Sequence, residues 1–337
     1  MGPKDIFNLL KETYRRFGED KAARLGASLA YYTIFSIAPL LVIAIAIAGL
    51  VFGQQAAQGQ IMGAIGGVVG QQGGQAIQTM VESASEPRAG GILITLLGFV
   101  TLLLGASGVF GALQDSLNTI WGVQTRPGGG IMGMIKERFF SFTLVVGTGF
   151  LLLVSLVVTA GLAAVSKWFS DYIPGGAGAW EAVNFVFSLV VITILFALIF
   201  KYVPDAEIAW RDIFIGAFVT ALLFTIGKFA IGLYLGRSSV TSAYGAAGSL
   251  VLVLLWIYYS AQILFLGAEL TQVVADKYGT PIVLKPSAVP LTEAARARQG
   301  VPRKDDVAEA ERTGRSVEDV AHSRDGERAG QRALSAE

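Results

Sequence analysis

The sequence predicts an all-α, polytopic membrane protein with six transmembrane helices and both termini in the cytoplasm. Of its 337 residues, 53% are hydrophobic and only 15% are charged, which is too apolar for an ordinary soluble chain. Six apolar runs are each long enough to cross about 30 Å of hydrocarbon as a helix. The predicted spans are about Tyr31–Phe52, Gly91–Gly111, Phe139–Val165, Ala182–Tyr202, Ile213–Leu235 and Ala246–Thr271.

The lysine and arginine residues give the orientation. Alternate segments between the spans carry 22 and 3 of them, with Lys201 counted in the loop that follows it and Lys228 alone lying within a span. Without the carboxy-terminal tail the counts are 11 and 3. Because basic residues near span ends stay in the cytoplasm, the richer segments, which include both termini, are predicted to lie inside.

Three parts are predicted along the chain. Residues 1–30 form an amphipathic helix that lies on the inner membrane surface or packs as a cytoplasmic cap. Residues 31–275 form the membrane domain, in which the glutamine- and glycine-rich loop 53–90 makes two short outer helices that cover a vestibule or pack on the bundle. Residues 276–337 form a charged tail without aromatic side chains beyond Tyr278, disordered or weakly helical and cytoplasmic.

Pro39 within the first span is expected to kink that helix, because proline removes a backbone hydrogen bond. Thr33 and Ser36 lie one turn earlier and can bond the freed carbonyls. In the second span, Gly105 and Gly108 belong to a face of small residues that allows close helix contact in lipid.

Polar residues within the apolar runs are the candidate functional residues. The sixth span has no formal charge from Gly248 to Gly267, yet polar groups recur along one side of it, which favours packing against other spans. Lys228 lies in the outer half of the fifth span, where it serves a pathway or reaches the surface by snorkelling. Glu269 lies at the inner boundary and is expected to pair with a basic residue of the amino-terminal segment. The substrate or pathway candidates are Lys228, Tyr258, Tyr259, Gln262, Glu269, Tyr31 and Tyr32.

The residue inventory argues against an enzyme. The chain has no cysteine, and its one histidine, His322, lies in the polar tail, so neither a zinc site nor a histidine-based triad is expected. No phosphate-binding GxxxxGK[ST] loop occurs, and no basic groove with acid–base partners for a nucleic acid is apparent. We therefore expect no catalytic residues, metal, cofactor or nucleic-acid partner.

Several segments together resemble the YihY/BrkB family of bacterial inner-membrane proteins. They are RLGASLAYYTIFSIAPLLV, GALQDSLNTIWGV, KYVPDAEIAWRDIFIGAFVTALLF and SAYGAAGSLVLVLLWIYYSAQILFLGAEL. The resemblance extends from about Phe7 to Tyr278 and implies six spans, cytoplasmic termini and an inner-membrane location. The family once carried a ribonuclease label, since lost, and is associated with virulence, envelope traits and proposed export of lipids or amphiphiles. It offers no agreed catalytic motif to transfer.

These observations favour a transporter or flippase for a lipid-like or anionic amphiphile. Membrane lipids are the expected partners, and the pattern allows a homo-oligomer. Two other classes stay open: a non-transporting scaffold for envelope or lipid homeostasis, and a channel. A channel would usually show charged rings or a repeated filter, and neither is visible in the sequence.

Overall fold

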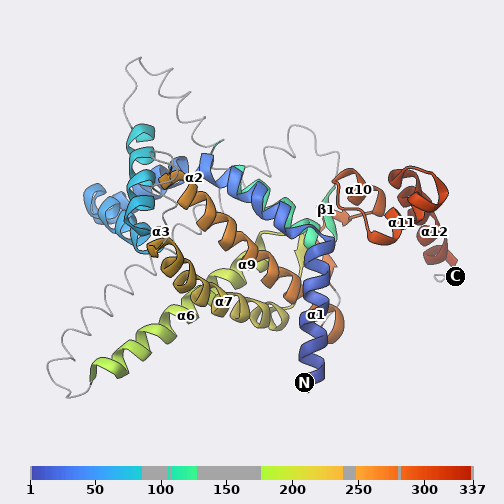
Figure 1. The fold of residues 1–337 in the computed structure, drawn as a ribbon, viewed down its shortest axis with the longest axis horizontal. Helices are drawn as coiled ribbons and strands as arrows, with labels where there is room; N and C mark the ends of the chain where they lie inside the picture. Colours follow the sequence, from blue (N-terminus) through green and yellow to red (C-terminus); the bar gives the residue numbers. More distant parts are fainter. Residues whose placement is uncertain are drawn as a thin grey trace, which may run out of the picture.

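The structure is a computed structural model that describes residues 2–85, 105, 108–126, 176–237, 248–279 and 282–334. These residues are mostly helical, and the long helices gather into one bundle (Figure 1). The labelled helices are α1 (Pro3–Glu19), α2 (Ala22–Phe52), α3 (Gln54–Ser85), α6 (Gly176–Tyr202), α7 (Trp210–Arg237), α9 (Gly248–Tyr278), α10 (Glu293–Arg298), α11 (Lys304–Thr313) and α12 (Val317–Leu334). Residues 108–120 are also helical.

Four of the described helices are long and apolar enough to cross a membrane. They are α2, α6, α7 and α9, and they match four of the predicted spans. The other two predicted spans, 91–111 and 139–165, lie outside the described residues except for 105 and 108–111. The total of six therefore stays a prediction, as does the cytoplasmic location of the termini.

Helix α9 packs directly against α7 through two glycine–threonine pairs. A methyl group at Gly216 of α7 would lie 1.7 Å from Oγ1 of Thr271, and one at Gly267 of α9 would lie 1.7 Å from Oγ1 of Thr220. Each threonine hydroxyl donates to the carbonyl of the glycine four residues before it, at 2.6 Å in α7 and 2.8 Å in α9. Glycine thus lets the two backbones approach closely while both hydroxyls stay hydrogen-bonded within their own helices.

The glycine face of the second predicted span packs on α2, as expected. A methyl group at Gly105 would lie 3.2 Å from Cγ of Pro39, and one at Gly108 would lie 3.4 Å from Oγ of Ser36. The Ser36 hydroxyl donates to the Gly105 carbonyl at 2.5 Å, and Thr33 donates to the carbonyl of Leu29. Neither hydroxyl bonds the carbonyl that Pro39 leaves free, so that part of the expectation is wrong. Helix α2 continues through Pro39, and the kink itself stays a prediction.

Helix α3 contains the two helices predicted for loop 53–90. They meet at Gly70, whose positive φ of 81° is one that glycine adopts without strain. Val69 and Ile77 are buried in a cluster with Ile45 of α2 and Val253 of α9. The loop was predicted either to cover a vestibule or to pack on the bundle, and its buried apolar residues agree with packing on the bundle.

Helix α1 presents two different apolar faces. Leu9 and Thr13 are buried, and Leu9 packs in a cluster with Leu270 and Val273 of α9. The opposite face exposes apolar and aromatic side chains to the surroundings. The cap alternative therefore describes the first face, and a membrane-surface helix stays the prediction for the second. The exposed residues are Ile6, Phe7, Leu10 and Tyr14.

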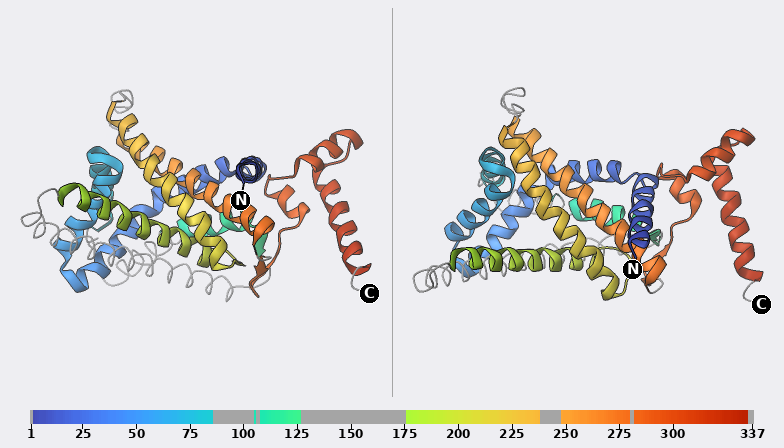
Figure 2. Two further views of the ribbon diagram at one scale, coloured as in Figure 1. Left: turned by 90° about the horizontal axis from the view of Figure 1, so that it is seen from below. Right: turned by 60° about the horizontal axis from the view of Figure 1, so that its bottom comes forward.

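The segment after α9 is more structured than its composition predicts. Strand β4 (Ala288–Pro290) pairs antiparallel with β1 (Val123–Thr125), and β3 (Val283–Leu284) pairs with β2 (Ala206–Glu207). Helices α10–α12 follow, beside the bundle on the side of α1 (Figure 2). This differs from the expected disordered or weakly helical tail. The physical reason is that its charges find partners: Arg324 pairs with Asp306 at 2.6 Å, and Asp325 accepts two backbone hydrogen bonds from the start of α10.

Candidate functional site

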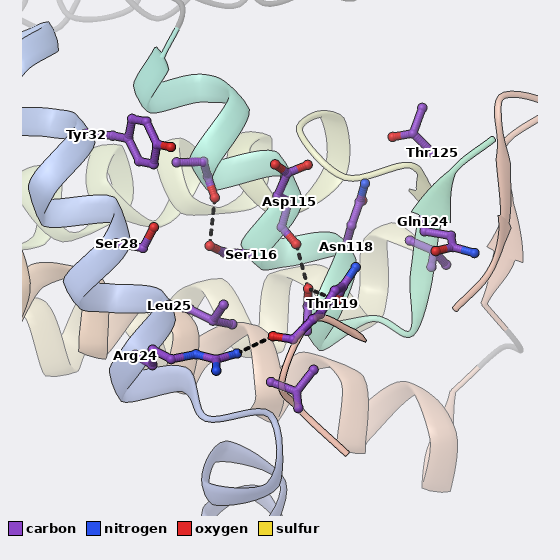
Figure 3. A pocket seen from close by; sticks show the side chains of 14 residues that line it. Arg24, Leu25, Ser28, Tyr32, Asp115, Ser116, Asn118, Thr119, Gln124 and Thr125 are labelled. Atoms are coloured by element: carbon purple, nitrogen blue, oxygen red, sulfur yellow. Dashed lines mark hydrogen bonds between the residues drawn. The ribbon is translucent and has the colours of Figure 1, made fainter. Parts of the chain in front are cut away.

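A cavity of about 480 Å³ lies between the start of α2, the helical segment 108–120 and the turn that follows α10 (Figure 3). Its lining is mainly polar, with hydroxyl and amide side chains, one guanidinium and one carboxylate. The lining residues are Arg24, Leu25, Ser28, Tyr32, Ala112, Asp115, Ser116, Asn118, Thr119, Val123, Gln124, Thr125, Gln299 and Val301.

Basic side chains at the start of α2 bind the turn that closes one side of the cavity. Arg24 donates to the carbonyls of Gln299 at 2.7 Å and Gly300 at 3.1 Å. Lys21 also donates to the Gly300 carbonyl, at 2.8 Å. Lys21 itself has a left-handed backbone, with φ of 51°, at the sharp junction between α1 and α2. This junction points both cations at the carboxy-terminal segment.

The opposite wall is fixed by a buried hydrogen-bond network around Asp205, in the turn between α6 and β2. Its carboxylate accepts from Asn118 Nδ2 at 3.0 Å and from Thr125 Oγ1 at 2.8 Å. Its amide donates to Asn118 Oδ1 at 2.8 Å. Both side chains that donate to this carboxylate are neutral.

A second, fully buried polar cluster lies behind the closing turn. Asp20, between α1 and α2, forms an ion pair with Arg296 of α10. Glu269 of α9 has no exposed surface, and the carboxyl of Asp20 lies close enough to act on it electrostatically. Burial raises the pKa of the Asp20 carboxyl above its ordinary value, and the Arg296 guanidinium opposes that rise. The cluster therefore links the amino-terminal junction, a membrane helix and the tail.

Of the predicted site residues, Tyr32 lies at the cavity and Tyr31 lies beside it. The two rings contact edge-to-face, with centroids 5.8 Å apart, and Tyr31 also contacts Phe35 at 5.0 Å. All three aromatic side chains are more than two-fifths exposed, and they form an aromatic face along the first half of α2. The structure thus brings the tyrosines of the first span to the cavity.

The predicted residues of the fifth and sixth spans do not line this cavity. Lys228 is exposed on α7, and the neighbouring Gly227 packs against the ring of Tyr259, whose hydroxyl would lie 1.9 Å from a methyl group there. Tyr258 is half-buried on α9. A pathway along this surface stays a prediction.

Gln262 and Glu269 both make contacts between elements. Gln262 packs on Gly26 of α2 and donates to the Ala23 carbonyl at 3.4 Å. Glu269 was expected to have a basic partner in the amino-terminal segment. Arg16 of that segment acts on Glu269 electrostatically. A second charged neighbour is the carboxyl of Asp20, which sequence reasoning did not foresee.

Sequence reasoning also missed the cavity, because its lining residues lie far apart in the sequence, with 275 residues between Arg24 and Gln299. One signal was available for the helix packing. The motif G-A-x-x-T occurs twice, as GAFVT from Gly216 and GAELT from Gly267, and its members are the glycines and threonines that bring α7 and α9 together. No comparable spacing marks the cavity.

Comparison with known proteins gives the family. The model of the family described as Virulence factor BrkB matches residues 13–292. A UPF0761 membrane protein of Ralstonia nicotianae is 30% identical over 266 residues, which cover 78% of this chain and 57% of the relative. A UPF0761 membrane protein of Verminephrobacter eiseniae is 31% identical over 76% of this chain and 59% of the relative.

A UPF0761 membrane protein of Mannheimia succiniciproducens is 28% identical over 78% of this chain and 88% of the relative. The chain thus spans less than two thirds of the first two relatives, whereas it covers most of the third. No solved structure matches. The apolar helices, the matched family model and these relatives lead to one conclusion: the chain is a membrane protein that belongs to the YihY/BrkB family.

Proposed function

We propose that this membrane protein carries a lipid-like or anionic amphiphile across the bacterial inner membrane and is not an enzyme. The observation that supports this most is the polar cavity of about 480 Å³ beside the membrane helix α2, continuous at Tyr32 with an exposed aromatic face. Amphiphiles have a polar head and an apolar chain. Cavity and face together offer one surface for each.

The head group fits the cavity by its chemistry. Arg24 supplies a guanidinium whose N–H groups beyond the two that bind the carbonyls of Gln299 and Gly300 can bind a phosphate or carboxylate. The hydroxyl of Ser28 and the amide of Gln124 supply neutral partners. The chain would lie along Tyr31, Tyr32 and Phe35, which are exposed within about one turn of the same helix.

The alternatives predict different surfaces. A scaffold has no need of a cavity with polar side chains beside a membrane helix. A channel needs repeated charges or carbonyls along a path, whereas this lining carries one arginine and one aspartate. The pathway predicted around Lys228, Tyr258 and Tyr259 would serve the outer half of the route, which the cavity does not reach.

A leaflet-exchange assay tests the proposal. The purified protein is reconstituted into vesicles with fluorescent phospholipid analogues, and outer-leaflet fluorescence is quenched chemically. We expect exchange well above that of protein-free vesicles. Ser28→Phe, which fills the cavity, should lower the rate by about tenfold or more, equivalent to ~1.4 kcal/mol of barrier.

Ala27→Phe is the matched control, because Ala27 is exposed on the same helix and does not line the cavity. It should exchange lipid at the unmodified rate. A head-group series of anionic, zwitterionic and neutral analogues then shows whether Arg24 selects anions. Equal rates for wild type, Ser28→Phe and empty vesicles would refute transport of these lipids, and ion conductance in the same vesicles would favour the channel.

A further inference from the structure

The buried carboxyl pair Asp20 and Glu269 has a property that ordinary ion pairs lack. Glu269 is 0% exposed, and within the described part of the chain neither of its oxygens has a hydrogen-bond partner. A second carboxyl, that of Asp20, is 6% exposed and lies close enough to act on Glu269 electrostatically. Two ionised carboxylates so placed in the interior would repel each other, whereas a proton on one of them lets it donate a hydrogen bond to the other.

The basic residues around Asp20 and Glu269 can balance one negative charge shared by the two carboxyls better than they can balance two. Arg296 of α10 forms an ion pair with Asp20, and Arg16 of α1 acts on Glu269 while its own guanidinium binds Asp276 at 2.6 Å. Arg303 acts on Asp20 from a greater distance and pairs with Glu293 at 2.9 Å. With a proton on the pair, Asp20 can pair with Arg296 while Glu269 stays neutral, and no carboxylates repel each other in the interior.

The same pair is connected mechanically to the cavity. Arg296 lies three residues before Gln299, and Gln299 and Val301 line the cavity. Helices α10–α12 also behave as one unit, because Asp325 of α12 accepts hydrogen bonds from the first turn of α10, and Arg298 pairs with Glu318. Loss of the Asp20 contact would therefore weaken the attachment of the whole unit and of one wall of the cavity, leaving the contacts of Lys21 and Arg24 with residues 299–300 to hold it.

We propose that Asp20 and Glu269 form a proton-binding site that docks the carboxy-terminal helices against the α1–α2 junction and closes the cavity wall. The idea that this docking controls a carrier rests on the proposed function. The dependence of docking on a proton does not rest on it. Arg296 and the residues it positions lie beyond residue 292, where the match to the family model ends, so the inference concerns this chain in particular.

The direction of the pH effect follows from burial. When α10 leaves, Asp20 meets water, its pKa returns towards the ordinary value, and the two carboxyls are no longer held together as a pair that must share one proton. The docked state then holds a proton at pH values where the undocked state has lost it. Docking is therefore favoured below the undocked pKa and weakens as pH rises through the docked pKa, by about tenfold in the docking equilibrium per pH unit for one proton.

Spin labels measure docking directly, and the cysteine-free chain accepts them without background. Asn8→Cys on α1 and Glu311→Cys on α11 place labels at two exposed positions. We expect one narrow distance at low pH and a longer, broad distribution as pH rises. In Glu269→Gln the side-chain amide can donate to Asp20 but does not titrate. The short distance between the two labels should therefore persist across the pH range in this variant.

Lys277→Gln, at an exposed position of the same helix outside the pair, should keep the pH response of the unmodified protein. Infrared spectroscopy gives a second readout: a protonated-carboxyl band at neutral pH that Glu269→Gln removes. A pH-independent distance in the wild type, an unchanged pH response in Glu269→Gln or the absence of that band would each overturn the site. Docking that responds to pH in a protein without lipid exchange would refute transport alone.

Discussion

At the scale of single residues, the structure rests on polar side chains that find partners far along the chain. Asn118 and Asp205 exchange two hydrogen bonds across 87 residues, and Arg24 reaches carbonyls 275 and 276 residues away. These bonds join segments that the charge pattern places on the same side of the membrane. Each buried member would leave an unpaired polar group if its partner were removed.

Asn118→Ala tests this network. The substitution removes a donor to the Asp205 carboxylate and the acceptor of the Asp205 amide, both buried. We expect a loss of about 1–3 kcal/mol in unfolding free energy, seen as a lower midpoint of thermal unfolding in detergent. Asn8→Ala is the control, since Asn8 is exposed, and it should change stability by less than ~0.5 kcal/mol. Equal stability of the two variants would contradict the role of the network.

At the scale of elements, close contact between α7 and α9 determines how the spans pack. Lipid chains are as apolar as leucine, so helix association depends on how near the backbones come. The paired glycines and threonines bring them together, whereas α3 uses ordinary apolar side chains to cover α2 and α9.

Gly267→Ala should disturb this crossing. The new methyl group would lie 1.7 Å from Thr220 Oγ1 and 2.8 Å from its Cβ, so α7 and α9 must separate. We expect a cost of about 1–3 kcal/mol, measured as a lower unfolding midpoint. Gly63→Ala in α3 serves as the matched control, because no atom lies within 4 Å of the added methyl group, and it should be tolerated. An unfolding midpoint of Gly267→Ala equal to that of the unmodified protein would contradict this prediction, because it would show that α7 and α9 accommodate the methyl group without cost.

At the scale of the whole molecule, three segments that the charge count assigns to the cytoplasm contact the fourth, the segment after α9. The amino-terminal segment binds residues 299–300, β1 pairs with β4, and β2 pairs with β3. Arg16 also pairs with Asp276 at the end of α9. This grouping agrees with a topology in which the four segments share one side of the membrane, because segments on opposite sides could not touch. That this side is the cytoplasm stays a prediction.

Single cysteines test the orientation in intact cells. Gln72→Cys in α3 should react with a membrane-impermeant maleimide from outside, and Ser287→Cys should react only after permeabilisation, because both positions are exposed but lie at predicted opposite sides. The cysteine-free chain is the control for labelling. A reversed pattern would overturn the orientation and place the cavity on the outer side.

The sequence was sufficient for local structure and insufficient for the site. The apolar runs of α2, α6, α7 and α9 predict helices because length and composition alone decide membrane insertion. The two helices around Gly70 followed from apolar spacing. The cavity and the Asp20–Glu269 pair depend on where distant segments meet, and the tail's composition concealed the ion pairs that order it.

The position of the cavity wall in the chain has a consequence for biogenesis. Lys21 and its carbonyl partner at Gly300 are separated by 279 residues, so ribosomes need roughly 15–55 s between making one and the other. During that interval every membrane helix can be inserted while the cavity lacks one side and Asp20 lacks Arg296. The nascent protein is thus an open form of the finished one, and its last assembly step is the arrival of the tail.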